Sequence, residues 1–281
     1  MTNILVTGSS GFIGKPTCNE LAARGMTAIP YDLPSSDIRD VSALREIVRL
    51  TDVQGIINLA GMLGTPELFG HEAKAAEVNI IGAINVYDVA SEVGIPVVQV
   101  GTGHKGQPNP YALTKACAED LGLARAQWLG HEVTILRAYH VYGPGQPVGP
   151  PHGTASVHKF FPTFATRALT NMPLELCGTG EQLIDTVYVD DVAVALVDAL
   201  AGPYGTVVEA GNGVPISVDQ VAQDILSKIP TSSSTITTVA GRSGEPRDAV
   251  VVATKPVCNN LWPYKATETI EWYQEWLTSS R

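Results

Sequence analysis

Near its amino end the chain reads NILVTGSSGFIG over residues 3–14, an apolar run followed at once by three glycines in GxxGxxG spacing. Between a predicted strand and a predicted helix, this spacing is typical of loops that bind a dinucleotide. Gly8 allows a sharp turn, Gly11 lets the backbone approach a pyrophosphate, and Gly14 lets the helix pack close to the strand. The helix would offer free N–H groups and its positive dipole end to the phosphates. Taken alone, the glycines also fit an ordinary strand–helix turn.

A second strand-like run at 27–31 ends beside Asp32. A carboxylate at the tip of that strand can accept both hydroxyls of an adenosine ribose, and it would repel a 2′-phosphate. The next three residues, Leu-Pro-Ser, supply no arginine for such a phosphate, although Arg39 is close in sequence. The sequence therefore predicts NAD as the cofactor and leaves NADP as a less favoured alternative. For Asp32 the other interpretation is a solvated turn residue.

Short apolar runs alternate with helical stretches through the first half of the chain. We expect strands at 3–6, 27–31, 55–59, 97–100 and 133–136, one more short strand near Ser36, and helices at 14–23, 41–50, 73–93 and 111–129. Several of the strands are apolar without alternation, which indicates burial on both faces of a parallel sheet. The pattern predicts an α/β fold with a Rossmann-type, doubly wound parallel sheet.

The composition changes after Tyr142, where residues 143–153 hold four prolines and four glycines and exclude regular structure. Mixed elements follow, with helices expected at 161–169, 192–200, 218–229 and 267–277 and a strand at 174–177. We therefore expect a dinucleotide-binding domain over residues 1–150 and a smaller mixed α/β substrate lobe over residues 151–281. Parts of the chain after residue 185 are expected to return to the first domain.

The composition narrows the class of protein. The chain has 281 residues, of which 44% are hydrophobic and 16% charged, which permits a sizeable core and excludes global disorder. Its net charge is −10, and without a basic cluster we expect neither a nucleic-acid nor a membrane partner. No apolar run approaches the ~20 residues of a membrane span, and we find no signal-peptide pattern. The four cysteines lack CxxC spacing, which argues against a metal site and favours a cytoplasmic protein.

Tyr111 and Lys115 stand four residues apart, so in a helix both lie on one face. A nearby cation favours phenolate, and we expect it to lower the pKa of the tyrosine. Such a tyrosine suits removal of a proton from a substrate hydroxyl while hydride leaves the same carbon, and its return in the reverse step. Lys115 is also suited to holding the nicotinamide ribose. For the spacing alone, a surface helix pair is the alternative.

Together these features resemble the extended short-chain dehydrogenases/reductases, the NAD-dependent epimerases/dehydratases of sugars, over nearly the whole chain. The resemblance also rests on Asn58–Gly61, Asn79, the segment Arg137–Gly145 and the segment Tyr188–Val192. It implies a small-molecule sugar substrate, and a homodimer formed through the predicted helices at 73–93 and 111–129.

The resemblance implies two sets of contacts. Cofactor contacts are implied for Gly8, Ser10, Gly11, Phe12, Ile13, Gly14, Asp32, Leu33, Asp37, Ile38, Leu59, Ala60, Gly61, Asn79, Val100, Tyr111, Lys115 and Tyr139. Substrate contacts are implied for Met62, Thr102, Gly103, His140, His158, Phe161, Leu176 and Arg247. Phe161 and Leu176 also fit a plain core of the lobe.

Thr102 matches the Ser or Thr that hydrogen-bonds the reacting oxygen in relatives, with a turn threonine as the alternative. The Gly103-His104 pair that follows lacks the acid pair of sugar dehydratases and disfavours dehydration. His104 instead stands at the offset of an acid–base group in relatives that epimerise carbons beside a keto group, with His158 or Lys159 as its partner from the lobe. A solvent-facing loop histidine is the other interpretation.

The chain departs from its relatives at the predicted substrate site. His140 replaces an asparagine, and Ile184 replaces an arginine found in relatives that bind nucleotide diphosphates, which weakens a nucleotide-sugar assignment. Arg247 matches a second arginine of the family, and Arg242 is a further candidate.

Three functions stay open at this stage. The first is an NAD-dependent epimerase that oxidises a secondary alcohol of a nucleotide-linked sugar to a keto intermediate and reduces it again through Tyr111 and Lys115. The second is a keto-sugar reductase or dehydrogenase that uses the same groups once. The third is a non-catalytic protein that senses NAD(P), which the short loop between Thr102 and Tyr111 and the loss of arginine at Ile184 suggest.

Overall fold

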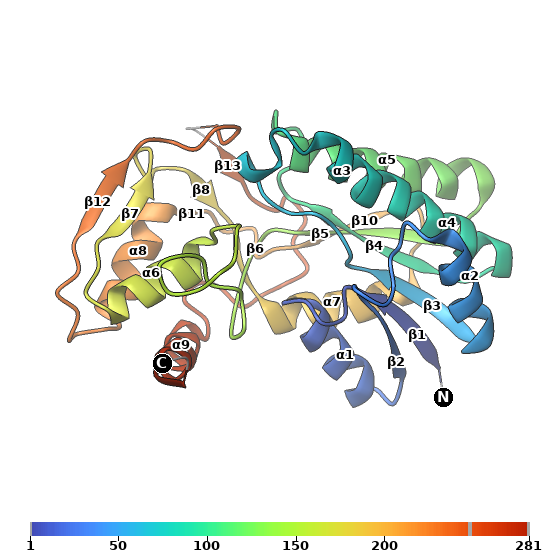
Figure 1. Ribbon diagram of the computed structural model, residues 1–281, viewed down its shortest axis with the longest axis horizontal. Coiled ribbons are helices and arrows are strands. Elements are labelled where there is room, and N and C mark those ends of the chain that lie inside the picture. The colour runs from blue at the N-terminus through green and yellow to red at the C-terminus, as the bar shows by residue number, and fades with distance from the viewer. Residues whose placement is uncertain (1, 247–248, 280–281) are drawn as a thin grey trace.

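The computed structural model describes residues 2–246 and 249–279 (Figure 1). Its largest sheet has six parallel strands in the order β10 (Val207–Ala210), β5 (Val133–Ala138), β4 (Val97–Thr102), β3 (Val53–Asn58), β1 (Asn3–Thr7) and β2 (Thr27–Tyr31). Starting from β1, the chain adds β2 on one side of this strand and then β3, β4, β5 and β10 on the other side. This confirms the predicted doubly wound sheet, whose switch point lies beside β1.

Helices cover both faces of this sheet (Figure 1). One face packs against α2 (Val41–Leu50), α4 (Gly82–Val93) and α5 (Pro110–Leu129), and the other against α1 (Gly14–Ala23) and α7 (Val189–Asp198). Along β1, Leu5 joins the first core while Ile4 and Val6 join the second. The strand is therefore buried on both sides, which explains its continuous apolar run.

One local expectation about the first half is wrong, and one predicted helix is present but irregular. Residues 33–35 form a turn and Ser36 has no regular structure, so no strand lies near Ser36. The helix expected over 73–93 is divided into α3 (Glu72–Ala76), a π-helical turn (Glu77–Ile81) and α4. The wider turn carries Asn79 inward, where it is 2% exposed. π-turns inside helices are often found at functional sites.

The carboxyl-terminal half builds a lobe beside the carboxyl ends of the strands. Its helices are α6 (Phe160–Leu169), α8 (Val218–Ser227) and α9 (Ala266–Ser279). Its short strands are β6 (His140–Tyr142), β7 (Leu174–Cys177), β8 (Leu183–Ile184), β9 (Thr186–Tyr188), β11 (Ile216–Ser217), β12 (Ile236–Val239) and β13 (Val250–Val251). α7 and β10 come late in the chain but pack with the first sheet.

The lobe has a core of its own, centred on stacked aromatic rings. The rings of Tyr142 and Phe161 lie 5.1 Å apart, and Leu174 and Leu176 close the same cluster. In the part of the chain that the structure describes, no helix has the length and apolar character needed to cross a membrane.

Candidate active site

The glycine loop joins β1 to α1 at the switch point of the sheet. Gly8 has φ +69°, and a Cβ there would lie 3.1 Å from the amide nitrogen of Ala60. A Cβ at Gly14 would lie 2.2 Å from the carbonyl oxygen of Gly8, so a larger residue would force the turn open. Within the described residues no side chain caps α1, and its first turn holds no acidic residue. The loop and helix start therefore fit the phosphates of a dinucleotide.

Asp32 follows β2 and turns its carboxylate toward this loop. It accepts hydrogen bonds from the backbone nitrogen of Ser10 at 3.1 Å and from Ser10 Oγ at 3.0 Å, and a further one from Ser9. An acid at this place fits the adenosine ribose of NAD.

Arg39 is engaged by two carboxylates. It binds Asp37 at 2.6 Å and Glu77 at 3.3 Å, and its guanidinium lowers the pKa of Asp37. An arginine held in this way is a poor receptor for a 2′-phosphate, which agrees with NAD as the cofactor. Ile38, beside it, is buried against Gly82.

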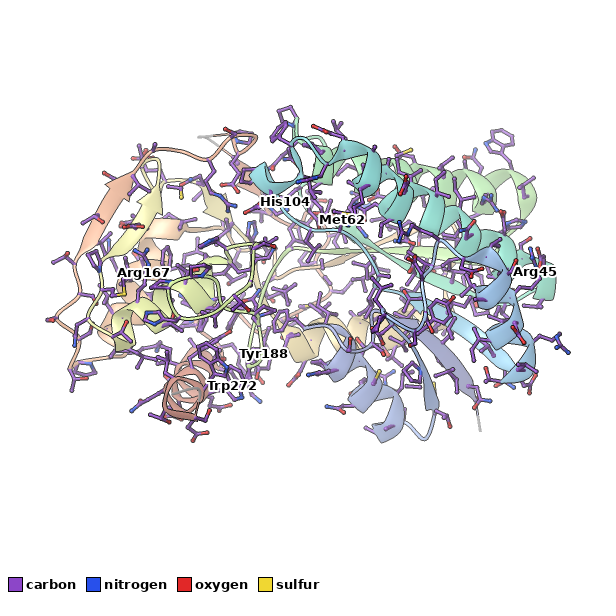
Figure 2. The ribbon with its side chains drawn as sticks, viewed as in Figure 1. Arg45, Met62, His104, Arg167, Tyr188 and Trp272 are labelled. Carbon is purple, nitrogen blue, oxygen red and sulfur yellow. The ribbon has the colours of Figure 1, made fainter. Side chains whose placement is uncertain are left out.

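The π-helical turn holds the loop after β3 in place. The side chain of Asn79 accepts a hydrogen bond from the Met62 nitrogen at 2.8 Å and donates to the Met62 carbonyl at 3.1 Å. It also donates to Thr114 Oγ at 2.9 Å, which ties this loop to α5. Figure 2 labels Met62 and His104 near the middle of the molecule, between the sheet domain and the lobe. Asn79 thus orients the segment Leu59–Met62 that borders the site.

Tyr111 stands at the start of α5, where Asn109 caps the helix by accepting a hydrogen bond from the Ala112 nitrogen at 2.9 Å. Its hydroxyl lies beside Thr102, which ends β4 and is 2% exposed, and the Thr102 side chain lowers the pKa of the phenol. Lys115 lies one helical turn further and is 3% exposed. The structure therefore brings the predicted phenol, hydroxyl and ammonium together.

The electrostatics of this group differ from the expectation. Burial raises the pKa of Tyr111, and the Thr102 side chain offsets only part of that rise. The expected net lowering by Lys115 is wrong in this structure, because desolvation of the phenolate dominates. Burial also lowers the pKa of Lys115 to about 8, although the carboxylate of Glu119 opposes the fall.

A cavity of about 470 Å³ opens beside Tyr111 and extends into the lobe. His104 reaches it from the turn after β4, with its Nδ1 3.2 Å from Thr102 Oγ1, and its ring meets the ring of His140 edge to face at 4.8 Å. His104 therefore faces the cavity, not bulk solvent. Burial, followed by repulsion from Lys159, lowers the pKa of His104 to about 4. Burial also holds the pKa of His140 well below its usual value.

The lobe supplies the rest of the cavity wall. Lys159 lines it and His158, which is exposed, lies at its edge. Sequence reasoning missed several lining residues, which carry no motif: Thr65, Gln107, Val157, Thr163, Phe164, Arg167, Glu175, Gln182, Leu183, Val239 and Val251. Two arginines of the wall are already ion-paired, Arg167 with Glu175 at 2.9 Å and Arg242 with Glu67 at 2.6 Å.

Two predicted substrate contacts are placed elsewhere. Phe161 is 0% and Leu176 2% exposed, and both pack inside the lobe core instead of lining the cavity. Phe160, one residue earlier, points to the cavity in their place. For Phe161 the physical reason is helical rotation, since neighbouring residues on α6 face directions about 100° apart. For Leu176 it is strand alternation, since Glu175 and Cys177 on either side of it in β7 line the cavity. Arg247 lies outside the described residues.

The remaining predicted cofactor contacts differ in how deeply they are buried. Phe12, Ile13, Leu59 and Val100 pack partly against the sheet core, whereas Leu33 is 69% exposed. Tyr139 donates a hydrogen bond to Glu209 at 3.0 Å.

A glycine loop at a switch point, an acid after β2 and a buried Tyr–Thr–Lys group beside a cavity define an NAD-dependent enzyme. The chain belongs to the NAD dependent epimerase/dehydratase family, whose model matches residues 4–211. It is 28% identical to a UDP-N-acetyl-alpha-D-glucosaminuronate decarboxylase of Bacillus cytotoxicus, over 96% of this chain and 97% of that protein. It is also 28% identical to a putative UDP-glucose 4-epimerase of Methanocaldococcus jannaschii, over 80% and 82%.

Solved structures share the fold. A UDP-glucose 4-epimerase of Thermotoga maritima with UDP-glucose superposes with a TM-score of 0.86, at 23% identity, over 98% of this chain and all of that one. The UDP-glucose 4-epimerase of Thermus thermophilus in complex with NAD has a TM-score of 0.83, at 23% identity, over 97% and 99% of the two chains.

Proposed function

We propose that this enzyme is an NAD-dependent epimerase of a nucleotide-linked sugar, which it oxidises transiently to a keto intermediate. The observation that carries the proposal is Tyr111 on the cavity wall, with the Thr102 side chain beside its hydroxyl and Lys115 on the same helix face. The names of relatives support the substrate class, since several act on UDP-linked sugars.

In the proposed mechanism Tyr111 is the acid–base group. Its phenolate oxygen removes the proton from a secondary alcohol of the sugar, and Thr102 Oγ1 holds the reacting oxygen through a hydrogen bond. NAD, when bound, would supply the acceptor and then the donor of the hydride. Lys115 would stabilise the phenolate and hold the cofactor ribose. Tyr111 would then return its proton to the oxygen of the rotated keto group, while hydride adds to the opposite face of the carbonyl carbon.

The cavity supplies positions for the rest of the substrate. His104 and His140 line it and present neutral imidazoles that suit hydrogen bonding to sugar hydroxyls, whereas Met62 and Gly103 are not among its lining residues. Lys159 and, at the edge, His158 extend this polar surface into the lobe. His104 also stands where it can exchange a proton with a carbon beside the keto group.

A reductase is the second candidate, because two relatives carry that activity in their names. One is a 2-alkyl-3-oxoalkanoate reductase of Stenotrophomonas maltophilia, 26% identical over 92% of this chain. The other is a UDP-2-acetamido-2,6-beta-L-arabino-hexul-4-ose reductase of Pseudomonas aeruginosa, 27% identical over 86%.

The amount of cofactor consumed per product distinguishes an epimerase from a reductase. The purified enzyme is incubated with a panel of UDP- and dTDP-linked sugars, and products are resolved by NMR. An epimerase converts many equivalents of sugar with its bound NAD and shows no steady change in NADH absorbance. Stoichiometric consumption of NADH or NAD would establish the reductase or dehydrogenase instead. If no sugar nucleotide is converted while bound NAD is retained, the substrate class is wrong.

We further propose a cytoplasmic homodimer that pairs through α4 and α5. The outer surface of α5 exposes Leu113 at 60% and Trp128 at 76%, which is unusual for apolar side chains of this size. Light scattering of the purified protein tests this, and a monomer at micromolar concentration would contradict it.

A further inference from the structure

Tyr111, Lys115 and Glu119 occupy successive turns along one face of α5. Unlike most carboxylates, Glu119 is almost fully enclosed, with a side chain that is 1% exposed. A buried carboxylate is costly unless it is paired and hydrogen-bonded. The burial of this charge therefore needs a physical explanation, which an exposed salt bridge would not need.

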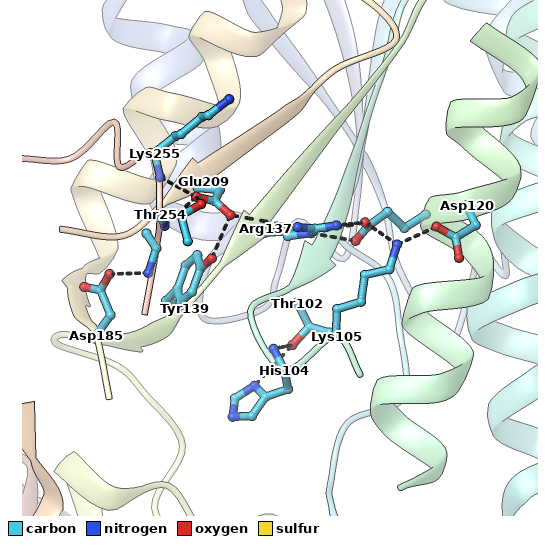
Figure 3. A network of polar contacts seen from close by, with 12 residues as sticks. Thr102, His104, Lys105, Asp120, Arg137, Tyr139, Asp185, Glu209, Thr254 and Lys255 are labelled. Carbon is cyan, nitrogen blue, oxygen red and sulfur yellow. Dashed lines mark hydrogen bonds and ion pairs between the residues drawn. The ribbon is translucent and has the colours of Figure 1, made fainter. Parts of the chain in front are cut away.

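Two cations from different elements compensate this charge. Lys105, from the turn after β4, contacts Glu119 at 2.9 Å. Arg137, from β5, donates from Nε to both carboxylate oxygens at 3.1 Å, and Nη2 makes a further bond. Figure 3 labels Arg137 and Lys105 and draws their polar contacts as dashed lines. Glu119 thus ties the turn that carries Thr102 and His104 to the helix that carries Tyr111.

The same carboxylate acts on Lys115 without touching it. Within the described residues Lys115 makes no ion pair, and its Nζ lies beside the loop after β3, where a Cβ on Gly61 would be 3.8 Å away. Burial lowers the pKa of Lys115, and the negative charge of Glu119 is what opposes that fall. Lys105 and Arg137 partly neutralise this charge.

Two further acids stand behind those cations. Asp120, which is 64% exposed, contacts the outer side of Lys105, and Glu209 lies 3.9 Å from Arg137. Tyr111 is the remaining titratable group on this face of α5. Because Glu119 is the buried anion of the group, it sets the field in which Lys115 holds its proton.

We propose that Glu119 is a positioning residue that keeps Lys115 in its ammonium form beside Tyr111, and that Lys105 tunes this effect. The inference rests on the proposed function, in which a cation at Lys115 stabilises the phenolate and holds the cofactor ribose. It assigns Glu119 an electrostatic role in catalysis in addition to the structural tie between β4, β5 and α5.

The charge of Glu119 can be removed with little change of shape by Glu119→Gln. Loss of the anion favours the neutral amine, so Lys115 should release its proton at a pH about one unit lower. Activity that needs the ammonium is present below that pH and lost above it. From pH 6.5 to 8 we expect kcat to fall about 8-fold in Glu119→Gln and about 2-fold in the wild type.

Two variants control the experiment. Asp120→Asn removes the exposed neighbouring acid that also contacts Lys105, and it should leave the wild-type pH profile unchanged. Lys105→Met removes a cation that screens Glu119, so it should move the basic limb of the profile to higher pH. These opposite directions separate an electrostatic effect from general damage to the fold, which would lower kcat at every pH alike.

A second readout is independent of turnover. The side-chain amine of Lys115 is titrated by NMR in the NAD-bound protein labelled at lysine, with Lys115→Arg to assign its signal. A lower midpoint in Glu119→Gln supports the proposal whether or not a sugar substrate has been found. An unchanged midpoint in a folded variant overturns it. A shifted midpoint with an unchanged kcat profile would leave Glu119 controlling Lys115 but would refute the catalytic role given to the ammonium.

Discussion

Tyr111, in the first turn of α5, lies beside Thr102 at the end of β4, and the Thr102 side chain lowers the pKa of the phenol. Tyr111 also lines the cavity that runs into the lobe. A phenol and a hydroxyl held in this way can grip one oxygen atom of a substrate between them. The predictions below follow from this arrangement and from the groups around it.

Replacement of Tyr111 by phenylalanine removes the acid–base group and keeps the ring. We expect kcat to fall at least ~100-fold, the usual scale for loss of such a group, with little change in NAD content. Steady-state rates on the true substrate measure the effect. Tyr204→Phe serves as the control, since this tyrosine is 38% exposed, donates to the Leu200 carbonyl and does not line the cavity. Equal rates for Tyr111→Phe and the wild type would refute the mechanism.

Replacement of Asp32 by alanine should weaken the binding of NAD and reduce the preference for NAD over NADP. The carboxylate is expected to accept the two ribose hydroxyls and to repel a 2′-phosphate, so its loss changes both affinities. We expect Kd for NAD to rise about 10-fold, and Kd for NADP to rise less or fall. Calorimetric titration of cofactor-free protein measures both. Glu271→Gln on the exposed side of α9 is the control, and an unaltered ratio of the two Kd values would contradict the assignment.

We expect the buried Lys115 ammonium to lower the free energy of unfolding, although the proposed reaction needs this group. Burial lowers the pKa of Lys115 to about 8 in the folded chain, against about 10.4 when unfolded. The unfolded chain therefore binds more protons between these values, so the free energy of unfolding rises with pH across that window, by up to about 3 kcal/mol. Lys115→Met should be more stable than the wild type at pH 7 and should lose this part of the pH dependence.

Urea unfolding at pH 7 and pH 9.5 measures the Lys115 effect as the difference between the two proteins, which cancels the titration of the other groups. The variant is also expected to lose most of its turnover. A wild type that is as stable as Lys115→Met at both pH values would show that the ammonium is not desolvated in solution.

A side chain at Gly14 should open the glycine loop. The Cβ of Gly14→Ala would approach the Gly8 carbonyl oxygen to 2.2 Å, so the backbone must shift. We expect a loss of more than ~2 kcal/mol of stability and of NAD binding together. Gly241→Ala is the matched control, because a Cβ at Gly241 meets nothing within 4 Å. Thermal unfolding and cofactor content report both effects, and normal NAD content in Gly14→Ala would refute the tight packing of the loop.

The spacing of residues within short stretches of the sequence was enough to predict much of the fold and part of the candidate site. The order of strands and helices in the first half, the glycine loop, Asp32 and the Tyr111–Lys115 pair can all be inferred from short stretches of chain. Their geometry depends on neighbours within a few residues, so helical and strand periodicity places them. The missing strand near Ser36 and the π-helical turn at Asn79 show the limit, since both depend on contacts with other elements.

Tertiary packing decided the rest. The contact between His104 and His140, the inward turn of Phe161 and Leu176, and the burial of Glu119 between Lys105 and Arg137 join residues that no sequence spacing relates. Packing also set the direction of the pKa of Tyr111, because desolvation depends on what covers the phenol and not on the lysine four positions away. The sequence by itself determines the geometry of residues close together in the chain. Burial, and electrostatic interactions between residues far apart in the chain, arise only when the chain has folded.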